Sequence, residues 1–172
     1  EINSIIRNRS TKISLLEDDI TIVKEISCIT LCCGEINTDI PTIMFLSGDY
    51  WYSNIQISKD KGFSIASVYD AVGSYAYFIN RAAAELILKK NPIPSCTADN
   101  WSLYRRQGVH LKAIFPYIID ANIENLESMI NQSTFGEIRK NMPIQMRLIA
   151  YWNSFIKRLL LAQGHFVSKI RK

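Results

Sequence analysis

Long hydrophobic runs are missing from this 172-residue chain. No apolar stretch approaches the roughly 20 residues of a membrane-spanning helix. No positively charged segment followed by an apolar one stands at the start to suggest a secretory signal. The sequence opens with Glu1 rather than Met, and a strand-like motif follows within twenty residues. We therefore expect a fragment, a processed product or an edited form of a longer protein.

Cysteine and histidine are scarce, with four and two residues respectively. No two cysteines form a C-x-x-C pair, which argues against a zinc site. Three of the cysteines fall within one expected helix, where a free thiol behaves as a small apolar side chain. The simplest expectation is a reduced, cytoplasmic protein. The residues concerned are Cys28, Cys32, Cys33, Cys96, His110 and His165.

Acidic residues are absent after Glu137, although eight lysines and arginines follow it in a chain of net charge +4. Membrane lipid or nucleic acid could neutralise such a tail, and a solvated basic helix is the alternative. Because no nucleic-acid-binding motif accompanies the charges, we expect no nucleic-acid partner. The expected partner is an anionic membrane, contacted peripherally at the inner face of the plasma membrane.

The remaining composition is globular, with 48% hydrophobic and 21% charged residues. The length suits one domain over residues 1–138, followed by a basic amphipathic helical tail over residues 139–172. Apolar, β-branched stretches alternate with helical patterns, which indicates an α/β fold. We expect strands at 13–16, 42–46, 63–69, 73–79 and 109–115, and helices at 22–33, 81–90, 99–106 and 144–162.

Single residues mark the ends of the expected helices. Gly34 is expected to end the first, because glycine favours the position after a helix. Asn80 is expected to cap the start of 81–90, and Pro92 follows its end. The last helix has one apolar stripe that could pack on the domain or lie in a bilayer interface. The stripe consists of Leu148, Ile149, Trp152, Phe155, Ile156, Leu159 and Leu160.

Three consecutive acids follow the first apolar strand, as Leu15-Leu16-Glu17-Asp18-Asp19. Adjacent like charges cost free energy unless something positive neutralises them. Side chains alternate along an extended chain, so Glu17 and Asp19 would project to one side and Asp18 to the other. Oxygen ligands of this kind suit Mg²⁺ or Mn²⁺ better than zinc. A solvated acidic turn, with Asp18 or Asp19 capping the next helix, is the alternative.

Three motifs stand in a fixed order along the chain: L-E-D-D at 16–19, G-S-x-A-Y at 73–77 with R-x-x-A at 81–84, and T-A-D at 97–99. This order resembles glycosyltransferase family 25, the lipooligosaccharide galactosyltransferase-like enzymes, over roughly residues 10–130. Family members have a longer section before L-E-D-D, and their P-V-D-like turn is T-A-D here. The resemblance therefore implies a GT-A-like fold without part of its N-terminal nucleotide-binding section.

The same resemblance implies transfer of a hexose, galactose at the family level, from a UDP-sugar to a lipooligosaccharide or another glycan, with inversion. Mn²⁺ or Mg²⁺ would bridge the donor phosphates. Asp19 is expected to bind this metal, with Asp18 and Glu17 as a second ligand or as partners of the donor's ribose. Gly73 and Tyr75 are expected at the donor sugar, although Gly73 could simply start a strand.

Asp99 precedes a short helix and matches the acid of the family, so the resemblance implies that it takes the acceptor's proton as general base. Asp70 and Asp49 are the reserves for that role. A plain helix cap is the alternative interpretation of Asp99. For the whole chain, the alternative is a non-catalytic fragment or degenerate relative that binds a saccharide or a partner.

An aromatic trio and an arginine pair each have two interpretations. Tyr50-Trp51-Tyr52 could stack on the acceptor sugar or pack in the core. Arg105 and Arg106 could bind phosphate or face the solvent. The sequence leaves both pairs of alternatives open.

Overall fold

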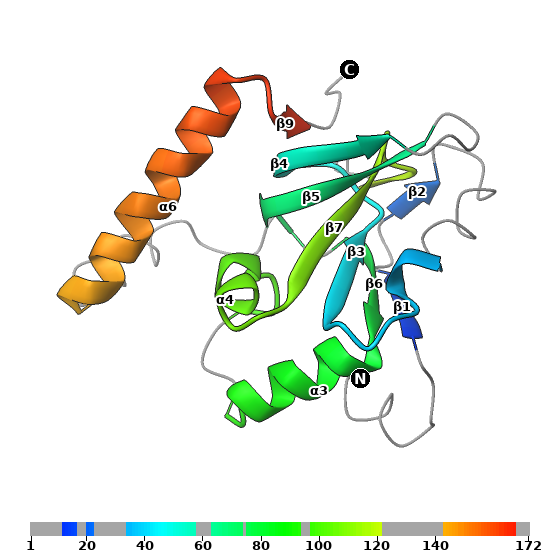
Figure 1. Cartoon of the computed structure of the whole chain (residues 1–172), viewed down its shortest axis with the longest axis horizontal. Coiled ribbons are helices and arrows are strands. Elements are labelled where there is room, and N and C mark those ends of the chain that lie inside the picture. The colour runs from blue at the N-terminus through cyan, green and yellow to red at the C-terminus, as the bar shows by residue number, and fades with distance from the viewer. Residues whose placement is uncertain are drawn as a thin grey trace.

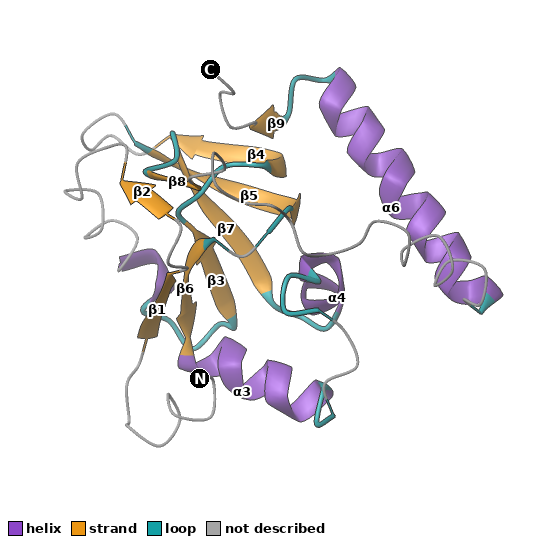
Figure 2. Ribbon diagram, turned by 180° about the vertical axis from the view of Figure 1, so that it is seen from behind, coloured by secondary structure: helices purple, strands orange, loops and turns teal. Residues whose placement is uncertain are grey.

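The computed structural model describes residues 12–16, 20–22, 34–57, 63–73, 75–93, 97–121 and 143–167. Its strands are β1 (Lys12–Leu16), β2 (Ile20–Ile22), β3 (Thr42–Phe45), β4 (Tyr50–Ile57), β5 (Ser64–Ala71), β6 (Ala76–Asn80), β7 (His110–Phe115), β8 (Ile119–Ala121) and β9 (Phe166–Val167). Its helices are α3 (Arg81–Lys90), α4 (Trp101–Arg106) and α6 (Ile144–Ala162). The architecture is mixed α/β, as the sequence predicts (Figure 2).

Most strands join one seven-stranded mixed sheet in the order β1-β6-β3-β7-β5-β4-β9, while β2 and β8 form a separate antiparallel pair (Figure 1). β3 lies in the middle and is buried along its whole length. It is parallel to β7 and antiparallel to β6, and β1 is antiparallel to β6 as well. The strands β1, β3 and β7 therefore point in one direction.

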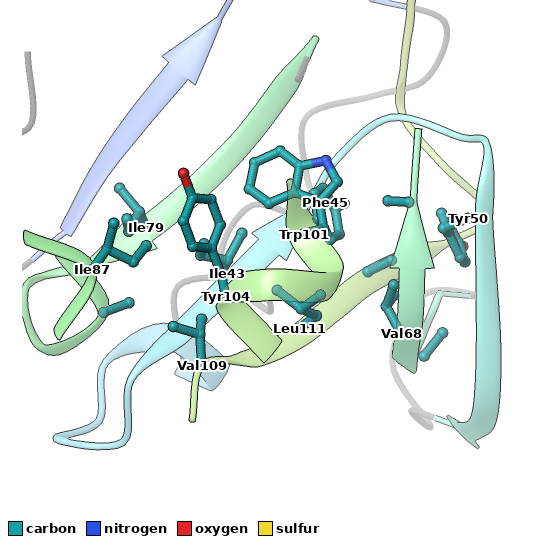
Figure 3. Close-up of a cluster of buried hydrophobic side chains, with 14 of the residues drawn as sticks. Ile43, Phe45, Tyr50, Val68, Ile79, Ile87, Trp101, Tyr104, Val109 and Leu111 are labelled. Atoms are coloured by element: carbon teal, nitrogen blue, oxygen red, sulfur yellow. The ribbon is translucent and has the colours of Figure 1, made fainter. Parts of the chain in front are cut away.

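The core occupies both faces of this sheet. Alternate residues of a strand point to opposite faces, so Ile43 and Phe45 of β3 join one apolar cluster, and Met44 and Leu46 join another. The first cluster lies under α3 and α4 (Figure 3) and combines Ala83, Ala84 and Ile87 of α3, Trp101 and Tyr104 of α4, and Ile79, Val109 and Leu111 of the sheet. Burial on both faces explains why β3 has an almost uninterrupted apolar sequence.

Asn80 caps α3, as the sequence predicts, and also fixes the loop that leads into β3. Its side-chain oxygen accepts hydrogen bonds from the backbone N–H groups of Ala83 at 2.9 Å and Thr42 at 3.0 Å. Its side-chain nitrogen donates to the carbonyl of Ile40 at 2.7 Å and to that of Thr38 at 2.9 Å. A buried amide is tolerated here because its polar atoms find partners.

Helix α6 stands to one side of the sheet, and both views show it apart from α3 and α4 along much of its length (Figures 1 and 2). A few side chains of α6 attach the helix to the rest of the molecule. Leu160 is buried, the hydroxyl of Tyr69 donates to the side-chain oxygen of Asn153 at 3.0 Å, and Lys157 forms an ion pair with Asp70. After the helix, β9 pairs with β4 and so adds the last strand to the sheet.

The structure corrects two expected helix boundaries. Ile22 ends strand β2 rather than opening a helix, because it pairs with Ile119 of β8. Residues 34–36 are helical, so Gly34 does not end the helix to which it belongs. Residues 23–33, which hold most of the expected helix and three cysteines, lie outside the described part of the chain.

Candidate functional site

Two of the three motif segments meet directly where β1 ends and β6 begins. Leu16, the last residue of β1, pairs with Ala76, the first residue of β6. On the other side of β6, the N–H of Leu46 donates to the carbonyl of Ala76 at 3.0 Å, so β3 ends at the same place. We call this region the carboxyl edge, and it comprises Leu16, residues 46–49, 72–73 and 75–76, and the start of α4. In α/β sheets, ligands bind beyond the carboxyl ends of the strands.

Gly73 occupies a backbone conformation that requires glycine. Its φ of 73° lies in the left-handed region. A Cβ atom built on it would also collide with the ring of Tyr75. The loop is held in place by the N–H of Val72, which donates to the carbonyl of Asp49 at 2.9 Å. Because β6 begins three residues later, Gly73 turns the chain before the strand. Its expected place at the donor sugar stays a prediction.

Trp101 brings the third motif segment to the carboxyl edge. Its indole N–H donates to the carbonyl of Gly73 at 2.8 Å. Its ring meets Phe45 edge-on at a centroid distance of 4.9 Å (Figure 3). It also meets Tyr77 edge-on at 5.1 Å. The side chain is only 1% exposed. Sequence analysis missed this residue, although a tryptophan two positions after Asp99 is a signal that the turn is anchored to the core.

Asp99 lies exposed in the turn before α4, and it does not cap the helix. The capping residue is Asn100, whose side-chain oxygen accepts from the N–H of Leu103 at 3.3 Å. The carbonyl of Asp99 accepts from the N–H of Trp101 at 2.8 Å. Among the described residues, nothing forms a hydrogen bond or ion pair with its carboxylate. The helix-cap interpretation of Asp99 is therefore wrong, and its carboxylate is open to the solvent.

The expected metal and ribose ligands Glu17, Asp18 and Asp19 lie outside the described residues. They follow Leu16 directly in the sequence, and the structure fixes Leu16 at the carboxyl edge. Within the described ranges, no group of three histidine, cysteine or carboxylate side chains is placed to hold a metal ion. Tyr75, which the resemblance places at the donor sugar, is half-buried beside Gly73.

The two reserve acids have different surroundings. Asp49 follows β3 at the carboxyl edge with a φ of 66°, a left-handed conformation that aspartate tolerates better than most residues. Asp70 is 5% exposed, accepts from the N–H of Ala71 at 3.1 Å and pairs with Lys157. A carboxylate engaged in this way holds α6 in place, so Asp70 is removed as a candidate base.

The aromatic trio packs in the molecule, and its interpretation as a sugar platform is wrong. Tyr50 is fully buried, and its hydroxyl donates to the carbonyl of Ile114 at 3.1 Å. Trp51 packs on Phe166 at a centroid distance of 4.7 Å, and Tyr52 stacks on His165 at 4.9 Å. These contacts hold β9 and the end of α6 against β4.

The arginine pair lies on the side of α4 that faces α6. The guanidinium of Arg105 lies over the ring of Tyr69 at 4.1 Å from its centroid, a cation–π contact. Arg106 is exposed. Both residues line a groove of about 680 Å³ whose opposite wall is formed by Leu148, Ile149, Trp152, Asn153 and Ile156 of α6. Neither of the two sequence interpretations anticipated this groove.

No family model and no curated protein matches this chain. The likeness to glycosyltransferase family 25 consequently depends on the three ordered motifs alone.

Proposed function

We propose that this chain carries part of the active site of a metal-dependent, inverting glycosyltransferase with a GT-A-like fold. It would transfer a hexose, galactose by the resemblance, from a UDP-sugar to a lipooligosaccharide or another glycan. The observation that supports the proposal most is the meeting of the motif segments at the carboxyl edge. Leu16 and Asp99 are 83 residues apart in the sequence. Leu16 nevertheless pairs with Ala76, and Trp101, two residues after Asp99, donates a hydrogen bond to Gly73 in the loop before that strand.

The carboxylates that follow Leu16 are suited to a hard divalent cation, because all the side-chain ligands they offer are oxygens. Asp19 would be the first ligand, with Asp18 as the second, and Glu17 would remain for the ribose hydroxyls. Mn²⁺ or Mg²⁺ held there would supply positive charge to the diphosphate as the bond to the sugar breaks. A site beyond the end of β1 agrees with the usual place of ligands in α/β sheets.

Asp99 would act as the general base. Inversion in one step requires an acceptor oxygen to attack the anomeric carbon from the side opposite the diphosphate. The carboxylate of Asp99 would take the hydroxyl proton as that bond forms. Its exposure and its lack of partners within the described residues leave the carboxylate accessible to an acceptor. Trp101 would position it by tying the turn to Gly73.

Calorimetry with UDP and Mn²⁺, together with an assay of sugar transfer or donor hydrolysis, tests the proposal. Asp19→Ala should abolish UDP binding. Asp99→Asn should leave binding unchanged and lower transfer by roughly 10²–10⁴-fold, the usual contribution of a general base. Asp39→Asn is the matched control, because Asp39 is an exposed acid in the loop before β3, at the opposite end of that strand.

Equal activity of all three variants would remove the assignment of these residues. Absence of any heat with UDP and Mn²⁺ would favour the alternative, a non-catalytic relative that binds a saccharide or a partner.

A further inference from the structure

The exposed face of α6 is apolar. Leu148, Trp152, Phe155 and Leu159 recur at steps of three and four residues, so they share one side of the helix. Their exposed fractions are 63%, 63%, 57% and 45%. Asn153, Lys157 and Leu160 make the contacts with the body from a different side. Large apolar patches that remain exposed usually mark an interaction surface.

Cations border this apolar face on two sides. Arg147 and Arg158 are eleven residues apart, about three helical turns, and therefore lie along one border. Arg105 and Arg106 of α4 form the other border across the groove. The Nε–H of Arg105 is buried and finds no acceptor among the described residues. The terminal nitrogens of both arginines remain suited to bind phosphate oxygens.

The positive charge of this surface favours an anionic partner. No aspartate or glutamate occurs in α6, and Asp70, the acid that touches it, is already paired with Lys157. A second copy placed face to face would bring these arginines against one another, which is unfavourable. An anionic bilayer offers both components that the surface needs, namely phosphate groups at the borders and hydrocarbon under the apolar residues.

We propose that α6 and the arginines of α4 form a docking face for an anionic phospholipid bilayer. The helix would lie in the plane of the interface, with Trp152, Phe155 and Leu159 below the headgroups and the arginines at the phosphates. Within the described part of the chain, no helix is long and apolar enough to cross a membrane. This inference depends on α6 and α4, and it holds whether or not the carboxyl edge binds UDP.

Sedimentation of the full chain with vesicles is the direct test. We expect binding to phosphatidylcholine vesicles that contain phosphatidylglycerol, and little binding to phosphatidylcholine alone. Leu159→Glu should weaken binding at least roughly tenfold, because it removes a leucine that would insert into the bilayer and adds a charge to the inserted face. Leu161→Glu is the matched control. Leu161 is 55% exposed but lies on another side of α6, so its substitution should have a much smaller effect.

Tryptophan fluorescence gives an independent measurement. Trp101 is 1% exposed and Trp51 is half-buried, whereas Trp152 is 63% exposed. Anionic vesicles should therefore shift the emission to shorter wavelength, and Trp152→Phe should remove the shift while binding persists. A shift that persists in Trp152→Phe would overturn the proposed depth of the helix.

The charge contribution is tested by the double variant Arg147→Gln/Arg158→Gln and by salt. Each removed cation should lower the partition coefficient roughly fivefold, and added salt should weaken binding of the unmodified chain. Equal binding by Leu159→Glu and Leu161→Glu would overturn the proposal. So would a concentration-dependent dimer, seen by analytical ultracentrifugation, that Leu159→Glu abolishes.

Discussion

At the scale of single residues, the carboxyl edge depends on a few side chains whose replacement has predictable consequences. Gly73 and Trp101 fix the course of the loop before β6, and Asp99 supplies an exposed carboxylate. Tyr50, which directly follows the edge residues 46–49, has a polar atom inside the core. Its hydroxyl is buried and donates to one carbonyl, that of Ile114.

Gly73→Ala should lower the free energy of unfolding by roughly 1–3 kcal/mol, because alanine is strained at this φ and the ring of Tyr75 would have to move away from its Cβ. Chemical denaturation measures the change. Gly34→Ala is the control, since Gly34 is helical and has no atom within 4 Å of an added Cβ. That substitution should be neutral or stabilise by up to about 1 kcal/mol. Equal destabilisation by both would contradict the assigned strain.

Tyr50→Phe should show a pH-dependent effect. Burial, with a smaller contribution from Tyr52, raises the pKa of Tyr50 above its ordinary value of 10.0. The unfolded chain therefore loses this proton first, so the stability that Tyr50 contributes is complete below pH 10 and declines above it. At pH 8 the variant should be less stable by about 1 kcal/mol, through the lost hydrogen bond.

Denaturation of both proteins between pH 8 and 11 measures this difference. The advantage of the unmodified chain should shrink above pH 10 by up to roughly 1.4 kcal/mol per pH unit. A constant difference across that range would show that Tyr50 ionises equally in the folded and unfolded states.

At the scale of elements, α6 is held by few contacts, and Lys157 makes two of them. Its ammonium pairs with the buried Asp70 and lies over the ring of Trp51 at 4.5 Å from the centroid. Removal of one partner leaves a buried charge uncompensated, which is costlier than removal of both. The attachment of α6 should therefore be sensitive to this single side chain.

Lys157→Met should lower the free energy of unfolding by roughly 3 kcal/mol, because Asp70 would remain buried without a cation. Adding Asp70→Asn to that variant should recover part of the loss. Arg158→Met is the control and should change stability by no more than about 0.5 kcal/mol, since Arg158 is exposed. Denaturation of the unmodified chain, Lys157→Met, Asp70→Asn and the double variant gives the coupling energy of the pair, and a value near zero would contradict its role.

At the scale of the whole molecule, stability is distributed unevenly between the sheet and α6. β3 and β7 lie side by side in the middle of the sheet, whereas α6 buries little beyond Leu160. Regions with few buried contacts open with low free energy. Bilayer binding by α6, as proposed above, would stabilise that element alone.

Hydrogen exchange followed by mass spectrometry should show this gradient. Peptides that cover β3 and β7 should exchange slowest, and those from the first half of α6 should exchange fast. Lys157→Met should accelerate exchange in α6 without changing β3, and anionic vesicles should slow it. Equal protection of α6 and β3 in the unmodified chain would contradict the uneven distribution.

Local sequence patterns were sufficient for several elements and insufficient for others. The predictions for 81–90 and 144–162 agree with α3 and α6 residue by residue, because the cap of α3 and the periodicity of both helices are local properties. Tyr50–Ile57 was not predicted as a strand, although its aromatic and β-branched residues favour one. The apolar spacing after Ile22 predicts a helix that begins at this residue. Ile22 instead pairs with Ile119 of β8, a residue that is distant in the sequence, so local spacing could not indicate the strand.

The sequence by itself determined the element types of α3, α6 and β3, the cap at Asn80 and the order of the three motifs. Each of these depends on residues that are close together in the chain. Tertiary structure decided that the motif segments meet at one edge, that Asp70 and the aromatic trio hold α6 and β9, and that the stripe of α6 stays exposed. Those outcomes depend on strand pairing and packing between distant residues, whose partners no local pattern specifies.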